Sequence, residues 1–366
     1  MRLVAPDPTT GRVKIADWLE LLALFSDRGR APISSIRSLI RRSGDDRLAA
    51  VELDLDADVE GEPEITERAA DDIEERVVEE LEFRAATLGD AYPFVIENGS
   101  DGASEQLVRR DDWADLATGS GFYAFCLLDS AIREKTITVP KGPERAHVTA
   151  IGKVFQICAC MAVGGYLNAD VVSFGFPRAT GDAFLPALKA TWERYGSFKV
   201  LDEVPYGFDD ALKDAGIDII AWRKFPDPFA ATFLMMVQVA SGLNWKDKAV
   251  GDDIRAFKNW FHAPRFENVV PAMCIPFPLW FDLDEPPSDD EGNKLPFSAG
   301  VATKFEYREA RFGIIFDRGR IALCSAAALA LPQPSAHTID GLDQIGEIST
   351  WISEVHDLLA ERRQAA

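Results

Sequence analysis

Two neighbouring apolar segments each carry one polar side chain that could take part in chemistry. The segment IDIIAW at 217–222 has Asp218 near its start, and TFLMMVQV at 232–239 has Gln238 near its end. Both are apolar, and the connection between them contains two prolines, so the pattern predicts two strands joined as a hairpin. Strands this apolar are typical of a sheet covered on both faces, where an unpaired carboxylate is costly. Asp218 therefore needs a hydrogen-bonding partner or a metal ion.

Predicted elements on either side place these two strands in a larger pattern. Apolar periodicity, with glycine and proline at the boundaries, defines each element. The sequence predicts helices at 151–167 and 181–196, the second ending at Gly196, strands at 197–204 and 268–281, and a helix at 244–262. With the strands around Asp218 and Gln238, the order is α-β-β-β-α-β, which several α/β folds share.

Asp218 and Gln238 suit metal-assisted hydrolysis of a phosphodiester. That reaction needs carboxylate or amide oxygens to hold Mg²⁺ or Mn²⁺, and a cation to stabilise the charge that develops on the phosphate. The charge balance is compatible with a polyanionic substrate near these residues. Residues 150–270 have a net charge of −1, against −13 for 1–149 and −7 for 271–366.

Two stretches, KDAGIDIIAW at 213–222 and QVASGLNWKDK at 238–248, resemble the PD-(D/E)XK nuclease superfamily, which has the restriction-endonuclease-like fold. The resemblance covers residues 182–278 and is to bacterial restriction and phage-defence proteins. It implies an α/β (α+β) fold with an αβββαβ core. It also implies an endonuclease that uses Mg²⁺ (or Mn²⁺) to cleave double-stranded DNA in a defence or restriction system.

The resemblance assigns two site residues and leaves a third position unmatched. Asp218 matches the metal-binding aspartate of the second core strand, and Gln238 matches the glutamate-or-glutamine position of the third. Two residues further on, where the superfamily places a lysine, this chain has Ala240. Either the core has lost catalysis, or a lysine from elsewhere supplies the positive charge.

Three lysines are candidates for the missing charge. Lys246 and Lys248 lie at the start of the helix that follows the Gln238 strand. Lys246 is preferred because it is closer to the end of that strand. Lys213, which precedes the Asp218 strand, is the third candidate.

Further acidic residues could complete the site. Many members of the superfamily carry an acidic residue on the first core helix, and Glu193, with Asp182 as a substitute, would fill that position. Asp214, four residues before Asp218, is either a further metal ligand or a side chain that forms a turn.

Each candidate also has an ordinary structural explanation. Asp218 could accept backbone hydrogen bonds at the end of its strand, and Gln238 could be a buried amide that pairs with a loop. Lys246 and Lys248 could be solvated, and Glu193 could lie on the surface. We interpret the set as functional because two polar residues on adjacent apolar strands, beside a basic helix start, coincide by chance less often than any one of them occurs.

Composition indicates a globular protein with reduced thiols. The 366 residues are 47% hydrophobic, enough for real cores, and their formal net charge is −21. No apolar signal segment opens the chain, and no uninterrupted apolar stretch of about 18 residues occurs, so a cytoplasmic location without a membrane span is expected. The cysteines lack the spacing of a disulfide framework and are expected to be reduced and buried: Cys126, Cys158, Cys160, Cys274 and Cys324.

Three regions are predicted along the chain. Residues 1–147 form a mostly helical acidic module that is expected to dock a partner protein of the same defence system, and residues 148–280 form the nuclease-like core. Residues 281–366 hold an acidic loop, a hairpin and a closing helix. The predicted elements of the first region are helices at 16–26, 65–88 and 120–134 and a strand at 49–57, and those of the third are a β-hairpin at 311–325 that turns at 317–319 and a helix at 338–363.

Other reaction types lack their motifs. The four histidines, His147, His262, His337 and His356, lie in unlike contexts, which argues against a zinc site or a histidine-based nuclease. No GxxxxGK[ST] or GxGxxG element occurs, which argues against an ATPase or a dinucleotide enzyme. Two alternatives to the nuclease remain. One is a nuclease-like scaffold without catalysis that binds nucleic acid or a partner protein, and the other is an acidic protein-interaction module.

Overall fold

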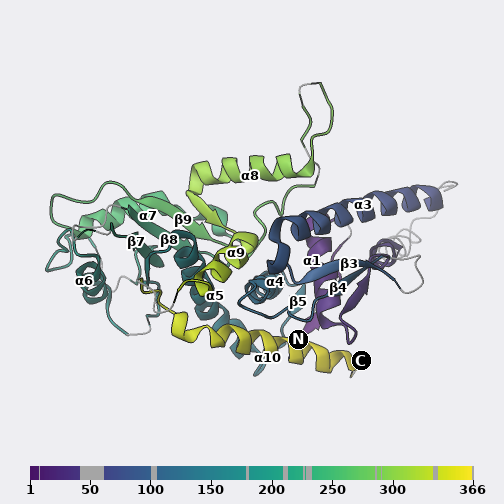
Figure 1. Cartoon of the computed structure of the whole chain (residues 1–366), viewed down its shortest axis with the longest axis horizontal. Coiled ribbons are helices and arrows are strands. Elements are labelled where there is room, and N and C mark those ends of the chain that lie inside the picture. The colour runs from purple at the N-terminus through teal and green to yellow at the C-terminus, as the bar shows by residue number, and fades with distance from the viewer. Residues whose placement is uncertain are drawn as a thin grey trace.

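A mixed β-sheet carries the segments around Asp218 and Gln238 (Figure 1). The computed structural model describes residues 1–7, 9–41, 62–99, 105–178, 181–208, 213–225, 227, 233–284, 287–289, 291–332 and 337–364. Within these residues the sheet has five strands in the order β10-β9-β8-β7-β6. They are β6 (Asp170–Ser173), β7 (Ile219–Arg223), β8 (Phe233–Val239), β9 (Val270–Cys274) and β10 (Ile314–Phe316).

The strand directions change across this sheet. β7 is antiparallel to both of its neighbours, with Ile219 opposite Ser173 in β6 and opposite Val237 in β8. β8, β9 and β10 run parallel to one another. A parallel pair needs a crossover connection, and the helix α7 (Val250–Phe257) lies in the crossover between β8 and β9. The fold is therefore of the mixed α+β class that the sequence predicts.

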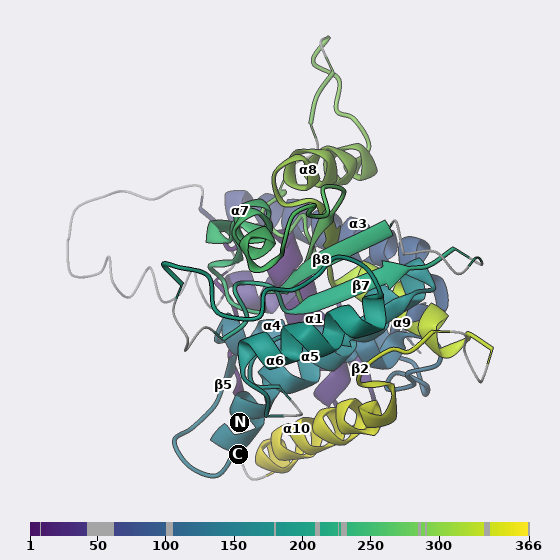
Figure 2. The ribbon, with the colours of Figure 1, turned by 90° about the vertical axis from the view of Figure 1, so that its left-hand side faces the viewer.

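Helices cover both faces of the sheet (Figure 2). Successive side chains of a strand point to opposite faces, so Ile219 packs in one apolar cluster and Ile220 in the other. This double burial explains the continuous apolar runs in β7 and β8. The first cluster includes residues of α5 (Arg145–Leu167) and α9 (Arg318–Leu329), and the second includes residues of α6 (Phe184–Tyr195) and α7.

Two of the predicted core elements need correction. The predicted strand at 197–204 is wrong, because this segment contributes only the isolated bridge between Val200 and Phe261 among the described residues. The strand beside β7 is β6, a run of four residues, and α6 lies in the connection between the two. The predicted helix at 244–262 is divided into η2 (Trp245–Asp247), α7 and η3 (Lys258–Trp260).

The predicted helices at 151–167 and 181–196 are confirmed by α5 and α6. Gly196 ends α6 in the left-handed conformation, with φ of 84°, and its N–H donates to Trp192 O. α5 is long and apolar enough to cross a membrane, with a mean hydropathy of 1.5, but 61% of that window is buried inside the fold. It serves as a core helix, because its apolar surface contacts α9 and the sheet.

The N-terminal region combines helices with small sheets. The predicted helices are confirmed, and the antiparallel sheet β2-β4-β3 was not predicted. The predicted strand at 49–57 lies outside the described residues. The elements are β1 (Arg2–Leu3), α1 (Arg12–Phe25), β2 (Arg30–Pro32), α3 (Glu62–Leu88), η1 (Gly89–Ala91), β3 (Phe94–Asn98), β4 (Glu105–Arg109), α4 (Ser120–Arg133) and β5 (Ile137–Thr138), which pairs with β1.

The predicted hairpin at 311–325 is wrong. β10 pairs in parallel with β9, and the chain then enters α9 instead of turning back. Asp317 is the N-cap of α9, since its Oδ1 accepts from Arg320 N at 3.0 Å. The segment DRG can form either a turn or a capped helix start, and the cap prevails here.

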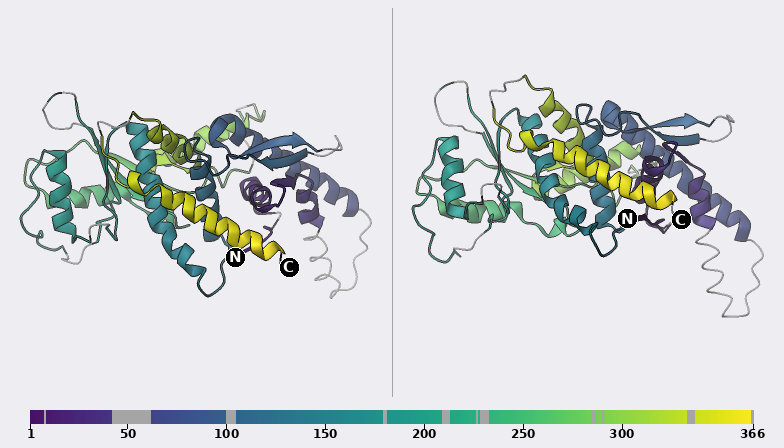
Figure 3. Two further views of the ribbon diagram at one scale, coloured as in Figure 1. Left: turned by 60° about the horizontal axis from the view of Figure 1, so that its bottom comes forward. Right: turned by 90° about the horizontal axis from the view of Figure 1, so that it is seen from below.

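Three further elements complete the C-terminal part. They are α8 (Phe297–Phe312), which was not predicted, η4 (Leu342–Gln344) and α10 (Gly346–Gln364), which confirms the predicted closing helix. α10 packs against α4 and α5 (Figure 3), so the last helix of the chain joins the N-terminal elements to the helix beneath the sheet.

A buried ionic network also ties the N-terminal elements to α9. The Arg84 guanidinium of α3 donates to Glu80 at 2.7 Å, to Glu20 at 2.8 Å and to Asp17 at 2.7 Å. Arg318 of α9 donates to both carboxylate oxygens of Asp17 at 2.8 Å. Both arginines are buried, so each charge depends on its partners for compensation.

Removing Arg84 should therefore destabilise the whole fold. Arg84→Met leaves buried carboxylates without their nearest cation, and we expect the free energy of unfolding to fall by about 3–5 kcal/mol in urea denaturation. Arg37→Met is the matched control, because Arg37 pairs with Glu74 and Asp71 on the surface, and its loss should leave stability close to that of the wild type. Equal losses in the two variants would contradict the role of the network.

Candidate functional site

Backbone and side-chain hydrogen bonds fix Asp218 at the start of β7. Its N–H donates to Val237 O of β8 at 2.9 Å. Its carbonyl oxygen accepts from the N–H groups of Phe174 and Gly175, at 2.7 and 2.8 Å, and from Gln156 Nε2 of α5 at 2.7 Å. Asp218 thus joins β6, β8 and α5 at one edge of the sheet.

One of the two oxygens of the Asp218 carboxylate accepts a hydrogen bond that holds the fold. Oδ2 accepts from Val239 N at 2.8 Å, which is the ordinary explanation that the sequence left open. Oδ1 faces Gly175, where an added Cβ would stand 2.8 Å away. Burial raises the pKa of Asp218 to about 6; the Val239 hydrogen bond opposes the shift. Part of this carboxylate is therefore available for another partner.

Gln238 holds a loop and leaves one oxygen unsatisfied. Its side chain is 4% exposed, and Nε2 donates to Gly216 O at 3.0 Å and to Asp253 Oδ2 at 3.3 Å. Oε1 is buried and has no hydrogen-bond partner among the described residues. Exchanging the two amide atoms would lose both donor contacts, so the oxygen is the atom without a partner.

Asp253 is a member of the site that the sequence analysis missed. It lies in the first turn of α7 beside Asp252, where acidic residues are common because they complement the helix dipole. Burial raises the pKa of Asp253, while Gln238 and Lys248 lower it. The sequence gives no signal that separates it from an ordinary first-turn acid, since only the tertiary contact with Gln238 does so.

Asp214 forms a turn, the second of the two roles considered for it. Its Oδ1 accepts from Gly216 N at 3.0 Å, and its carbonyl accepts from Ile217 N at 3.1 Å. Gly216 has φ of 76° and lies against Asp253, so a side chain there would meet both strain and a clash. The charge of Asp214 also raises the pKa of Asp218.

The structure separates the two lysines of the β8–α7 connection. Lys246 Nζ lies 3.4 Å from Asp282 Oδ2 and 4.5 Å from the ring centroid of Phe281, so it points toward α8. The charge of Lys248 instead lowers the pKa of both Asp218 and Asp253. We call Asp214, Asp218, Gln238 and Asp253 the acidic cluster. Of the two lysines, Lys246 pairs with Asp282, and Lys248 is the one whose charge lowers the pKa of Asp218.

The remaining candidates lie outside this cluster. Glu193 is on the exposed face of α6, and Asp182 is exposed just before that helix. Lys213 is exposed, with Nζ 5.2 Å from the ring centroid of Phe176. Ala240 is 4% exposed within the apolar cluster that contains α6 and α7, so a lysine at this position would bury its stem or its charge.

The cysteines offer no nucleophile. All five are free, and Cys126, Cys158, Cys160 and Cys274 are buried, as the sequence predicts. Burial raises the pKa of Cys324, the most accessible of them, to about 11. A thiol with this pKa carries little thiolate at neutral pH.

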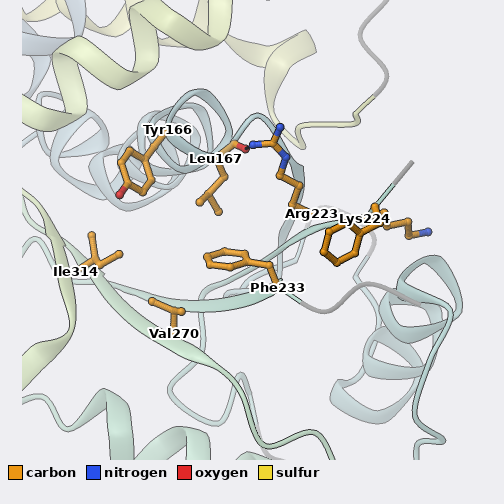
Figure 4. Close-up of a pocket in the computed structure, with 8 residues that line it drawn as sticks. Tyr166, Leu167, Arg223, Lys224, Phe233, Val270 and Ile314 are labelled. Atoms are coloured by element: carbon orange, nitrogen blue, oxygen red, sulfur yellow. Dashed lines mark hydrogen bonds between the residues drawn. The ribbon is translucent and has the colours of Figure 1, made fainter. Parts of the chain in front are cut away.

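An apolar pocket lies at the opposite end of the strands (Figure 4). It has a volume of about 690 Å³, and its lining includes Tyr166, Leu167, Arg223, Phe233 and Val270. Arg223 ends β7 and Phe233 begins β8, whereas Asp218 precedes β7 and Gln238 lies near the end of β8. Among the described lining residues there is no carboxylate, so the acidic cluster is the better candidate for a reaction centre.

Within the described residues, no group of three or more histidine, cysteine, aspartate or glutamate side chains is arranged to hold a metal ion. No protein-family model, curated protein or solved structure matches this chain. The chemistry of the site therefore depends on what its own residues can do: Asp218, Gln238, Asp253 and Lys248.

The raised pKa of Asp218 predicts a pH-dependent cost to stability. The folded chain binds this proton more tightly than the unfolded chain, whose pKa is near 3.8, so stability from this group is lost as pH rises from about 4 to about 6. Asp218→Asn removes the cost and keeps an acceptor for Val239. Its stability relative to the wild type should be about 2–3 kcal/mol more favourable at pH 7 than at pH 4, as measured by urea denaturation. The same difference at both pH values would show that Asp218 titrates normally.

Proposed function

We propose that this protein is a metal-dependent endonuclease that hydrolyses double-stranded DNA, with a restriction-endonuclease-like core. The single observation that supports this best is the pair of polar contacts where β7 begins and β8 ends: Gln238 donates to Asp253, and Asp218 accepts from Val239 N. The charge of Lys248 lowers the pKa of both carboxyl groups. The element order α5-β6-β7-β8-α7-β9 also agrees with the αβββαβ core, apart from the inserted α6. A bacterial defence or restriction setting and a cytoplasmic location are part of the same proposal.

The donor atoms at this edge suit Mg²⁺ or Mn²⁺. Gln238 Oε1 is a buried oxygen without a hydrogen-bond partner among the described residues. Burial is the main cause of the raised pKa of Asp218, and the charges of Asp214 and Asp253 add to it while Lys248 opposes it. Mg²⁺ is commonly bound through one or two carboxylates, with water and substrate phosphate completing its shell. Asp218 and Gln238 would hold the ion, with Asp214 or Asp253 as an outer partner. When bound, the ion supplies an activated water and offsets charge on the phosphate.

The protein residues divide the remaining tasks. Lys248 stabilises the negative charge that develops at the scissile phosphate, which is the role of the lysine absent at Ala240. Asp253 orients the Gln238 amide through its hydrogen bond, so the Gln238 oxygen faces away from the loop. Gln156 and Val239 hold Asp218 in place from either side.

Cleavage of supercoiled plasmid in Mg²⁺ or Mn²⁺ tests this function. We expect the wild type to nick or linearise the plasmid, Asp218→Asn to abolish cleavage, and Lys248→Met to reduce its rate by about 10²–10³-fold. Lys199→Met is the matched control, because Lys199 is 71% exposed and pairs with Asp202, outside the cluster; its rate should equal that of the wild type. Cleavage that survives in Asp218→Asn would refute the proposed site.

A second candidate function follows from Ala240. The lysine position of the superfamily is filled by a buried alanine, and Asp218 and Gln238 both make structural hydrogen bonds. A nuclease-like scaffold without catalysis, which binds nucleic acid or a partner protein, fits these facts. Under this reading the wild type cleaves nothing, calorimetry shows no Mg²⁺ binding that depends on Asp218, and DNA binding persists in Asp218→Asn.

A further inference from the structure

One side of α8 carries three cationic side chains and one aromatic ring. Lys304, Tyr307, Arg308 and Arg311 recur at spacings of three and four, which places them on the same side of the helix. Tyr307 is 70% exposed, and its ring centroid is 6.0 Å from the Arg308 guanidinium. This stripe thus carries three cations in a chain whose net charge is −21.

This stripe is continuous with the β8–α7 connection. The Arg308 guanidinium lies 5.5 Å from the ring centroid of Trp245, and Arg311 Nη2 donates to Lys246 O at 3.4 Å. Lys246 follows Trp245 and lies two residues before Lys248, whose charge acts on Asp218. α8 is on the outside of the fold, beyond α7 and the sheet (Figures 1 and 2). We define Lys246, Lys304, Tyr307, Arg308 and Arg311 as the α8 surface.

Three of the four cations of the α8 surface share one carboxylate. Asp282 lies 3.4 Å from Lys246, 3.0 Å from Lys304 and 2.9 Å from Arg308. Burial raises the pKa of Asp282, but these three cations outweigh it and hold the pKa below its ordinary value. In the described part of the chain, Asp282 is the only carboxylate that forms an ion pair with Lys246, Lys304 or Arg308. The α8 surface therefore keeps more positive charge than its own carboxylate neutralises.

We propose that the α8 surface binds the phosphate backbone of double-stranded DNA beside the acidic cluster, with Asp282 standing where a phosphate would interact in the bound state. This inference deepens the proposed function and rests on it for the identity of the ligand. Lys304 to Arg311 spans about 10 Å of helix. Duplex DNA carries about six phosphate charges over that length, so the stripe matches several phosphates at once. Lysine and arginine contacts of this kind set position on the duplex without reading its sequence.

Fluorescence anisotropy with a labelled duplex in EDTA tests binding without cleavage. Lys304→Glu/Arg311→Glu, both at accessible positions, should weaken binding at least tenfold and reduce the slope of log affinity against log salt by about 2. Lys304→Arg/Arg311→Lys should bind like the wild type. Asp282→Asn should bind several-fold more tightly, because it removes the competing carboxylate. Lys153→Glu/Lys199→Glu is the matched control on other helical and loop surfaces and should leave affinity close to that of the wild type.

The outcomes separate this surface from the proposed reaction. If the wild type cleaves plasmid and Lys304→Glu/Arg311→Glu binds and cleaves equally well, the result refutes DNA binding by the α8 surface and leaves the nuclease proposal intact. If the wild type never cleaves but Lys304→Glu/Arg311→Glu loses DNA binding, the result supports DNA binding by the α8 surface and refutes the nuclease proposal. Binding of polyglutamate in preference to the duplex would overturn the DNA assignment in favour of an acidic peptide.

Discussion

The arrangement of the chain depends on the buried network of Arg84 and Arg318 with Asp17, Glu20 and Glu80. Charged groups removed from water are tolerated only while every partner stays in place, so the network fixes α1, α3 and α9 relative to one another. Burial raises the pKa of Glu20 although Arg84 opposes it, and the hydroxyl groups of Tyr92 and Tyr123 donate to the same carboxylate. Because α9 also packs on α5 beneath the sheet, the network anchors the N-terminal elements to the layer that supports Asp218.

Much of the fold was predictable, and the failures have physical causes. The apolar runs of β7 and β8 and the glycine that ends α6 identified those elements correctly. β6 has four residues directly after a long apolar helix, so its pattern could not be distinguished from the helix end. The segment around Asp317 was predicted as a turn only, but an aspartate can also cap a helix, and in the fold Asp317 caps α9 after β10 has paired in parallel with β9.

The site was predictable in part for a related reason. Asp218 and Gln238 lie on consecutive strands, so antiparallel pairing was enough to bring them to one edge. Asp253 comes from a helix whose rotation against the sheet is set by tertiary packing, which no local pattern records. Lys246 and Lys248 are two residues apart, yet one pairs with Asp282 and the other acts on Asp218. The two lysine side chains point in different directions although they are close in sequence, because η2 turns the backbone between them.

The long connection that holds α6 has a consequence for the order in which the sheet assembles. β7 and β8 are separated by residues 224–232, whereas residues 174–218 separate β6 from β7. Loop closure is slower and entropically more costly for the longer segment, so we expect the β7–β8 pair and α7 to form local contacts before β6 joins them. Asp214, Asp218, Gln238 and Asp253 all belong to that early contiguous segment. The acidic cluster is thus a unit of low contact order, and the contacts of Asp218 with Gln156, Phe174 and Gly175 are the ones that join it to more distant parts of the chain.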